Sequence, residues 1–94
     1  MKINHFEEVE AWKKSQLIAV RIYKLLQANV DFGFKNQIQR AAISISNNIA
    51  EGFERDGTIE FRQFLTIAKG SAGETRSQIY RLFDYEYISE ERFL

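Results

Sequence analysis

The chain has 94 residues, of which 45% are hydrophobic and 28% are charged, so its composition is that of one small globular domain and not of a disordered segment. Thirteen basic residues balance thirteen acidic ones, which argues against general binding of polyanions, and the lack of cysteine excludes disulfide bonds and thiolate metal sites. We therefore expect a single domain over 1–94, in which any nucleic-acid binding depends on local clusters of charge.

The first predicted helix covers about 5–28. Asn4 followed by Glu7 is typical of a capping arrangement that opens a helix. At about 100° per residue, the apolar side chains of this segment fill well over half of the helix circumference. A surface helix needs only a stripe somewhat wider than about 100°. More than one apolar neighbour is therefore expected to pack against this helix.

Two further helices are predicted over about 33–54 and 58–85. The residues at 29–33 and 56–58 read as turns, and Thr58 is a good N-cap for the later helix. The later helix carries a heptad seam, because apolar or small residues alternate at spacings of four and three. The seam consists of Phe61, Leu65, Ala68, Ala72, Thr75, Ile79 and Leu82.

The sequence after this seam predicts the start of a fourth helix at 89. Three helices of this length leave an apolar face larger than the few hundred Å² typical of a monomer surface. Further residues in the native gene, or neighbouring subunits, are therefore expected to cover that face. The predicted fold class is all-α, an antiparallel up-down four-helix bundle with the last helix truncated or missing in this chain.

Four segments resemble the motifs of a known family. They are FEEVEAWKK at 6–14, RAAISI and NIAEGF within 40–53, FRQFL and IAKGS within 61–71, and DYEYIS at 84–89. In order and spacing they are similar to the four-helix-bundle family named for proteins encoded in 23S rRNA intervening sequences, and to the accessory protein of diversity-generating retroelements. The resemblance implies a bundle that assembles as a ring, most often a homopentamer, without enzymatic activity. It also implies association with RNA or a ribonucleoprotein.

A polar stripe follows the second predicted helix. Spacings of four put several of its residues on one face, where guanidinium, hydroxyl and amide groups could hold a phosphate or the edge of a base. The same groups could instead form a hydrogen-bonded network between helices or subunits, since buried polar groups are paired in proteins. We favour the network, because a ring-forming bundle needs such specifying contacts. The stripe consists of Arg40, Ser44, Asn47, Asn48 and Glu51.

A basic row follows the third predicted helix. Arg62, Lys69 and Arg76 recur every seven residues and are expected on one side, opposite the core seam. Tyr80 joins them and could stack on a base, and Arg55 in the preceding turn extends the row. Such a row is the electrostatic footprint of a nucleic-acid interface. The alternative is an ordinary solvated helix face.

Two glycines interrupt the third predicted helix. Gly70 and Gly73 lie with Ser77 away from the core seam. Because a glycine inside a helix costs about 1 kcal/mol relative to alanine, the two need a physical reason. Close approach of a neighbouring helix is the reason we favour, and it points to contact between subunits.

The sequence offers little for catalysis. His5 is the only histidine and lies near the N-terminus, so no Ser-His-acid set can be built, and the five glycines form no phosphate-binding loop. No segment has the length and hydropathy of a signal peptide or membrane span. We expect no enzyme, cofactor, metal ion, small-molecule substrate or membrane partner, and a cytoplasmic, bacterial-type protein.

The predicted function is that of a non-enzymatic homo-oligomer, a pentamer by the family resemblance, that associates with RNA or a ribonucleoprotein. The alternative is a protein-interaction scaffold without a nucleic-acid partner. The net charge of zero favours it, and so does the polar stripe, which would then contact another protein. The two differ in salt dependence, because binding to RNA weakens steeply as salt is added.

Overall fold

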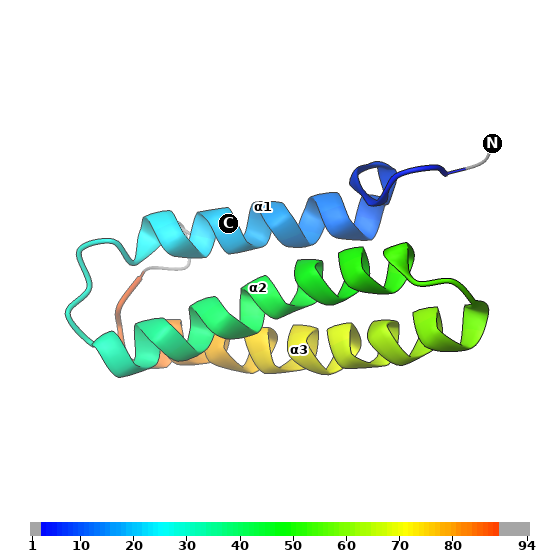
Figure 1. Ribbon diagram of the computed structural model, residues 1–94. Helices are drawn as coiled ribbons and strands as arrows, with labels where there is room; N and C mark the ends of the chain where they lie inside the picture. Colours follow the sequence, from blue (N-terminus) through cyan, green and yellow to red (C-terminus); the bar gives the residue numbers. More distant parts are fainter. Residues whose placement is uncertain (1–2, 89–94) are drawn as a thin grey trace.

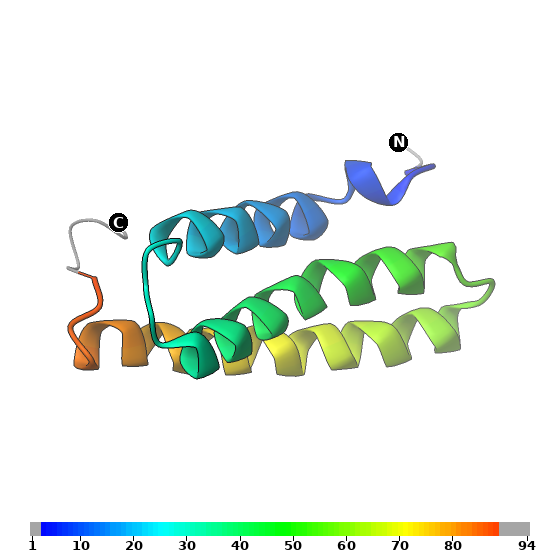
Figure 2. The ribbon, with the colours of Figure 1, turned by 60° about the vertical axis from the view of Figure 1, so that its left-hand side comes forward.

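The computed structural model describes residues 3–88, and within them the chain is all-α, with three helices and no strand. Helix α1 covers Glu10–Leu25, α2 covers Phe32–Glu54 and α3 covers Thr58–Asp84. They follow one another up and down, and α2 lies between α1 and α3 in both ribbon views (Figures 1 and 2). The fourth helix predicted to start at 89 lies outside the described residues.

The first helix is shorter than the predicted range of 5–28. The segment Phe6–Glu8 forms a single 3₁₀ turn, η1, and Val9 is extended, with φ −75° and ψ 121°, so the α-helix begins only at Glu10. The predicted cap at Asn4 is wrong, because His5 precedes the turn and its side chain makes no capping hydrogen bond. Packing of Phe6 against Trp12, with ring centroids 5.2 Å apart, places η1 against α1 instead of in line with it.

The ends of α2 and α3 agree closely with the predicted ranges. The Asp31 side chain caps α2, since its Oδ1 accepts a hydrogen bond of 3.2 Å from the backbone N–H of Phe34. At the start of α3 the N-cap is Gly57 and not Thr58 as predicted. Gly57 has φ 119°, a backbone conformation that glycine adopts without strain.

The hydrophobic core follows α2 from end to end. Its larger cluster lies where α1 connects to α2, and it includes residues of all three helices and Ile88. A smaller cluster joins Ile45 and Ile49 of α2 to Ala68 of α3, with Val9 and Trp12 packed against it. The larger cluster consists of Ile22, Leu26, Phe34, Ile38, Ala42, Leu82 and Ile88.

Only some residues of the predicted seam of α3 are buried. Ala68 and Leu82 are buried, whereas Leu65 and Ala72 are exposed. The reason is that α1 and α3 both pack on α2 and leave an apolar groove of about 220 Å³ between them. The molecule is accordingly flat and long, measuring 43 × 22 × 17 Å. The radius of gyration is 14.6 Å, whereas a compact chain of this length has about 12 Å.

Candidate functional site

Part of the polar stripe of α2 joins α2 to α3. The Asn48 amide donates to the backbone oxygen of Ser44 at 2.8 Å and to its hydroxyl oxygen at 2.9 Å. The hydroxyl of Ser71 on α3 donates to the same Ser44 Oγ at 2.8 Å. All three side chains are half-buried. Ser44 and Asn48 therefore form a network between helices, to which α3 adds Ser71, a residue that the sequence reasoning missed.

The rest of the polar stripe lies apart from that network. Arg40 and Asn47 are exposed, and Glu51 forms an ion pair with Arg55 at 2.9 Å. The Arg55 guanidinium also lies over the ring of Phe64, 5.3 Å from its centroid. Arg55 is therefore engaged at the corner between α2 and α3, where it is not available as a free extension of the basic row.

The basic row lies on an exposed flank of α3. Arg62, Lys69, Arg76 and Tyr80 are all exposed, and they fall within a sector of about 40° at 100° per residue. No carboxylate of residues 3–88 forms an ion pair with the three cations. Arg76 lines the groove between α1 and α3 together with Ile79. The row is thus beside the core seam and not opposite to it, because the seam itself faces that groove.

The row and the interhelical network occupy different flanks of α3. Lys69 and Ser71 are two residues apart, which is about 200° around the helix. Ser71 faces α2, whereas Lys69 is exposed. The structure therefore does not combine the two predicted sets into one site.

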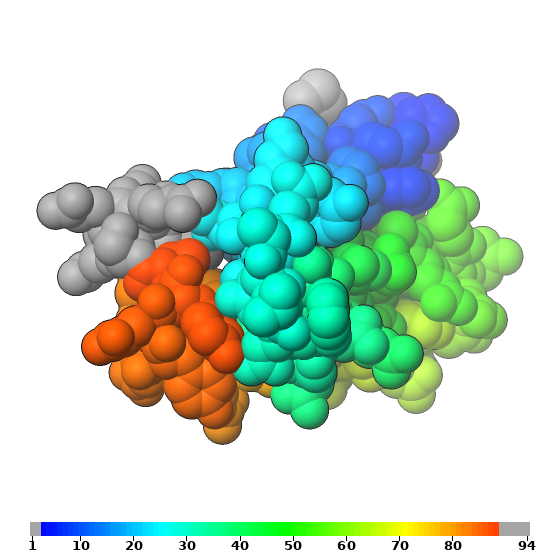
Figure 3. Space-filling model, turned by 90° about the vertical axis from the view of Figure 1, so that its left-hand side faces the viewer, coloured from blue at the N-terminus to red at the C-terminus, as the bar shows by residue number. Residues whose placement is uncertain are grey.

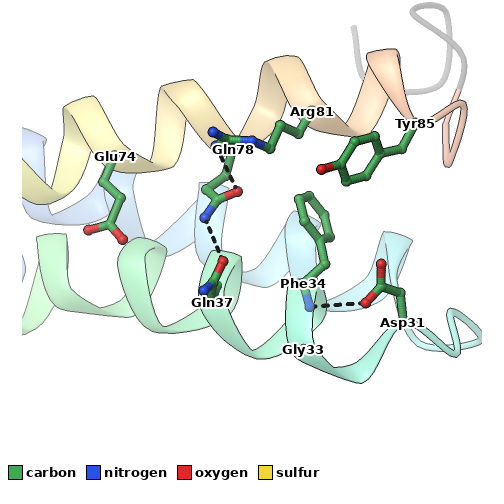
Figure 4. A pocket seen from close by; sticks show the side chains of 8 residues that line it. All are labelled: Asp31, Gly33, Phe34, Gln37, Glu74, Gln78, Arg81 and Tyr85. Atoms are coloured by element: carbon green, nitrogen blue, oxygen red, sulfur yellow. Dashed lines mark hydrogen bonds between the residues drawn. The ribbon is translucent and has the colours of Figure 1, made fainter.

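A polar hollow of about 550 Å³ opens between the start of α2 and the end of α3 (Figure 4). Inside it, Gln78 Nε2 donates to Gln37 Oε1 at 3.3 Å, and Arg81 Nη1 donates to Gln78 Oε1 at 3.3 Å. This site was not predicted from the sequence. One signal was present, since Gln78 lies three residues after Thr75 and four before Leu82, which puts an amide on the buried face. The hollow is lined by Asp31, Gly33, Phe34, Gln37, Glu74, Gln78, Arg81 and Tyr85.

The end of this hollow is closed by the chain that follows α3. The Tyr87 hydroxyl donates to Asp31 Oδ2 at 2.5 Å, and this contact joins the α1–α2 connection to the segment that follows α3. The connection and the end of α3 lie side by side in Figure 3. The rings of Tyr85 and Tyr87 each lie 5.6 Å from that of Phe34, centroid to centroid. Glu86, between the two tyrosines, has φ 59°, a left-handed conformation that is uncommon outside glycine.

The contact between Tyr87 and Asp31 makes the stability of the fold depend on pH both in acid and in alkali. The Tyr87 hydroxyl, and then the Phe34 N–H, lower the pKa of Asp31 below its ordinary 3.8. The hydrogen bond to Asp31, and then burial, raise the pKa of Tyr87 above 10.0. The contribution of Asp31 is therefore complete above pH 3.8 and is lost as the pH falls through the lowered pKa. That of Tyr87 is complete below pH 10.0 and is lost as the pH rises through the raised pKa.

The variant Tyr87→Phe is expected to unfold at a lower urea concentration than the wild type at neutral pH, because Asp31 loses its hydroxyl donor. Its further loss of stability in acid and in alkali should be smaller than that of the wild type. Urea titrations followed by circular dichroism in acid, at neutral pH and in alkali measure both effects. Identical pH profiles for the two proteins would show that the contact is not formed in solution.

The described residues also bear on metal binding and on membrane insertion. Among residues 3–88, no group of three or more His, Asp or Glu side chains is arranged to hold a metal ion. None of the helices in this part of the chain has the length and apolar character needed to cross a membrane.

The comparison with known proteins gives a match that covers all three helices. A sequence model of the family described as 23S rRNA-intervening sequence protein matches residues 7–94. The search of curated proteins gives no match. The matched range includes α1, α2, α3, the basic row and the polar hollow, so the resemblance of the sequence motifs to this family is confirmed.

Proposed function

The chain belongs to the family of 23S rRNA-intervening sequence proteins, and from this premise we propose that it is a non-enzymatic protein that assembles with copies of itself and binds RNA or a ribonucleoprotein. The observation that carries RNA binding is the basic row of α3, whose three cations are exposed and unpaired among the described residues. Cations of this kind contact phosphates without a competing carboxylate.

Assembly and a fourth helix are supported by the groove between α1 and α3. Its walls include Ile18, Ile45 and Ile79, and an apolar surface of this kind is normally covered. Ile88, 7% exposed, packs in one cluster with Ile22 of α1, so the chain leaves α3 towards the end of this groove. We infer that a fourth antiparallel helix, entered at that point, completes the bundle.

Self-assembly supplies the affinity that one neutral chain lacks. A ring repeats the three cations once per subunit, and the linked contacts gain through effective concentration. The open flanks at Gly70 and Gly73 suit an approach by a neighbouring subunit, since a Cβ added at either glycine would meet no atom within 4 Å. A homopentamer is the assembly that we propose.

Reversing the charge of Arg62, Lys69 and Arg76 to glutamate is expected to weaken binding to single-stranded RNA by about tenfold or more. Each lost phosphate contact should also reduce the slope of log affinity against log salt by about 0.7, hence by about 2 for the three. Fluorescence anisotropy with a labelled oligoribonucleotide across a salt series measures both quantities, and light scattering during size-exclusion chromatography reports the assembly.

The matched control reverses the same number of charges at Lys13, Lys24 and Lys35, which lie on α1 and at the start of α2. It should keep most of the affinity, because the total change in charge is the same and the basic row of α3 is left intact. Equal losses of RNA affinity in the two triple variants would show that the basic row is not the RNA interface.

The second candidate is a protein-interaction scaffold, which the exposed apolar groove favours. An interface of mainly apolar character changes little with salt, whereas RNA binding weakens steeply. The same salt series therefore separates the two functions. A protein that retains no RNA at low salt, yet forms the expected assembly, is a scaffold.

A further inference from the structure

The polar hollow lies apart from the basic row. It opens on the flank of α3 that faces α2, where Glu74, Gln78 and Arg81 line it (Figure 4). The row lies on the other flank, beside the groove to α1. Any ligand of the hollow is therefore recognised by groups that the basic row does not use.

The walls of the hollow are held in place from both helices. Gln78 is only 6% exposed, and its amide is fixed by Gln37 on one side and Arg81 on the other. The hydrogen bond from Tyr87 to Asp31 fixes the aromatic end. A site whose groups are already ordered loses less entropy when a ligand binds.

The charges of the hollow restrict the class of ligand. Glu74 and Asp31 oppose an anion, and Arg81 opposes a cation. A neutral group with both donors and acceptors can use the amides, the carboxylate and the guanidinium together. The rings of Phe34 and Tyr85 at one end favour a flat, aromatic ligand. A nucleobase meets all of these conditions.

We propose that the hollow binds one unstacked guanine base of an RNA strand, an inference that rests on the proposed RNA association. Single-stranded RNA is recognised in this way, by stacking of splayed bases on aromatic rings and hydrogen bonds to their edges. Tyr85, 52% exposed at the rim, provides the stacking surface. The 2′-hydroxyls and phosphates of the strand stay outside, in solvent.

Guanine fits because its two edges differ in chemistry. Its N1–H and N2–H groups are adjacent donors, which match the two oxygens of the Glu74 carboxylate. That carboxylate has no hydrogen-bond or ion-pair partner among residues 3–88. The O6 and N7 atoms of guanine are acceptors for the N–H groups of Arg81 and Gln78. Adenine presents an acceptor at N1, which the carboxylate would repel.

The test compares three labelled heptaribonucleotides, UUUGUUU and the same strand with adenine or inosine at the centre, by fluorescence anisotropy at one low salt concentration. The wild type should bind the guanine strand at least about fivefold more tightly than the adenine or inosine strand. Glu74→Gln should bind guanine and inosine strands equally, since inosine lacks only the N2 amino group. The matched control, Glu60→Gln, removes the same charge from the first turn of α3 and should keep the preference.

A second variant and a second probe make the result independent of folding and of phosphates. Tyr85→Leu should weaken all three strands together, with an unchanged circular dichroism spectrum. Guanosine alone should shift the side-chain amide signals of Gln37 and Gln78 in nitrogen-15 NMR spectra, while adenosine should not.

The outcomes separate the guanine site from the proposed function. If the strands bind with equal affinity, RNA association stands and the guanine site is wrong. A guanine preference that survives Glu74→Gln also overturns the site. If guanosine shifts the amide signals but no strand binds, the base chemistry of the hollow holds and RNA as its source, together with the proposed function, fails. Absence of both effects overturns everything proposed for the hollow.

Discussion

Truncating Leu82 to alanine is expected to lower the free energy of unfolding by about 2–5 kcal/mol. Leu82 is 0% exposed and belongs to the cluster that joins all three helices, including Ile22 of α1 and Ile38 of α2. Removal of its side chain leaves a cavity that rigid neighbours on two helices cannot fill. Because a small domain has only about 5–15 kcal/mol of stability, the variant should be largely unfolded well below the midpoint temperature of the wild type.

The matched control is Leu17→Ala on α1. Leu17 is 63% exposed, so the same chemical change removes little buried area and should alter stability by less than about 0.5 kcal/mol. Urea titration of both variants and of the wild type gives the two differences. If Leu82→Ala were no more destabilising than Leu17→Ala, the larger cluster would not be the core of the folded chain.

Replacing Gly52 with alanine is expected to destabilise the protein by about 1–3 kcal/mol through overpacking. A Cβ at this position would lie 2.7 Å from Cβ of Phe64 and 3.0 Å from Cδ1 of Phe61. The Phe64 Cβ cannot move without its backbone, so α2 and α3 must separate at this crossing. Thermal unfolding followed by circular dichroism measures the loss.

Gly70→Ala on α3 is expected to change the free energy of unfolding in the opposite direction. No atom lies within 4 Å of a Cβ added there, and alanine favours a helix over glycine by about 1 kcal/mol. The isolated chain should therefore gain stability. A ring in which a neighbour packs on this face should lose it, so the variant is measured as a monomer and at assembling concentrations. Equal effects of Gly52→Ala and Gly70→Ala on the monomer would contradict the close crossing of α2 and α3.

The sequence predicted α2 and α3 well because their signals are local. Turn residues flank both helices, and apolar residues repeat along each at helical spacing. The start of α1 could not be read in the same way. Asn4 and Glu7 have the spacing of a capping box, but packing of Phe6 on Trp12 sets the direction of the chain there. The same segment also packs on α2, where Val9 and Trp12 lie against Ile45 and Ile49, and such tertiary packing overrides a local cap.

The heptad seam of α3 shows a different limit of periodicity. The pattern correctly predicts which residues share an apolar face, and Ala68 and Leu82 are buried as expected. It does not say whether a neighbour is present, and Leu65 is exposed because α1 packs on α2 instead. Periodicity thus reports the face of a helix and not the number of its partners.

Candidate sites were predictable only where one helix holds them. The basic row needs a spacing of seven on α3 alone, and its exposure followed from the pattern. The polar hollow depends on residues far apart in the chain. Asp31, at one end of it, is hydrogen-bonded to Tyr87, 56 positions away, and Gln37 to Gln78, 41 positions away. No local sequence pattern predicts that such residues lie side by side.

The central place of α2 has a consequence for how the folded chain opens. Helix α3 is held to α2 by buried side chains and also by the bond from Ser71 to Ser44 and that from Gln78 to Gln37. Helix α1 faces α2 mainly through apolar contacts and leaves its other side on the groove. The partial unfolding that costs the least free energy is therefore expected to release α1 while α2 and α3 stay packed together. Local opening of α1 is accordingly expected to need less free energy than separation of α2 from α3.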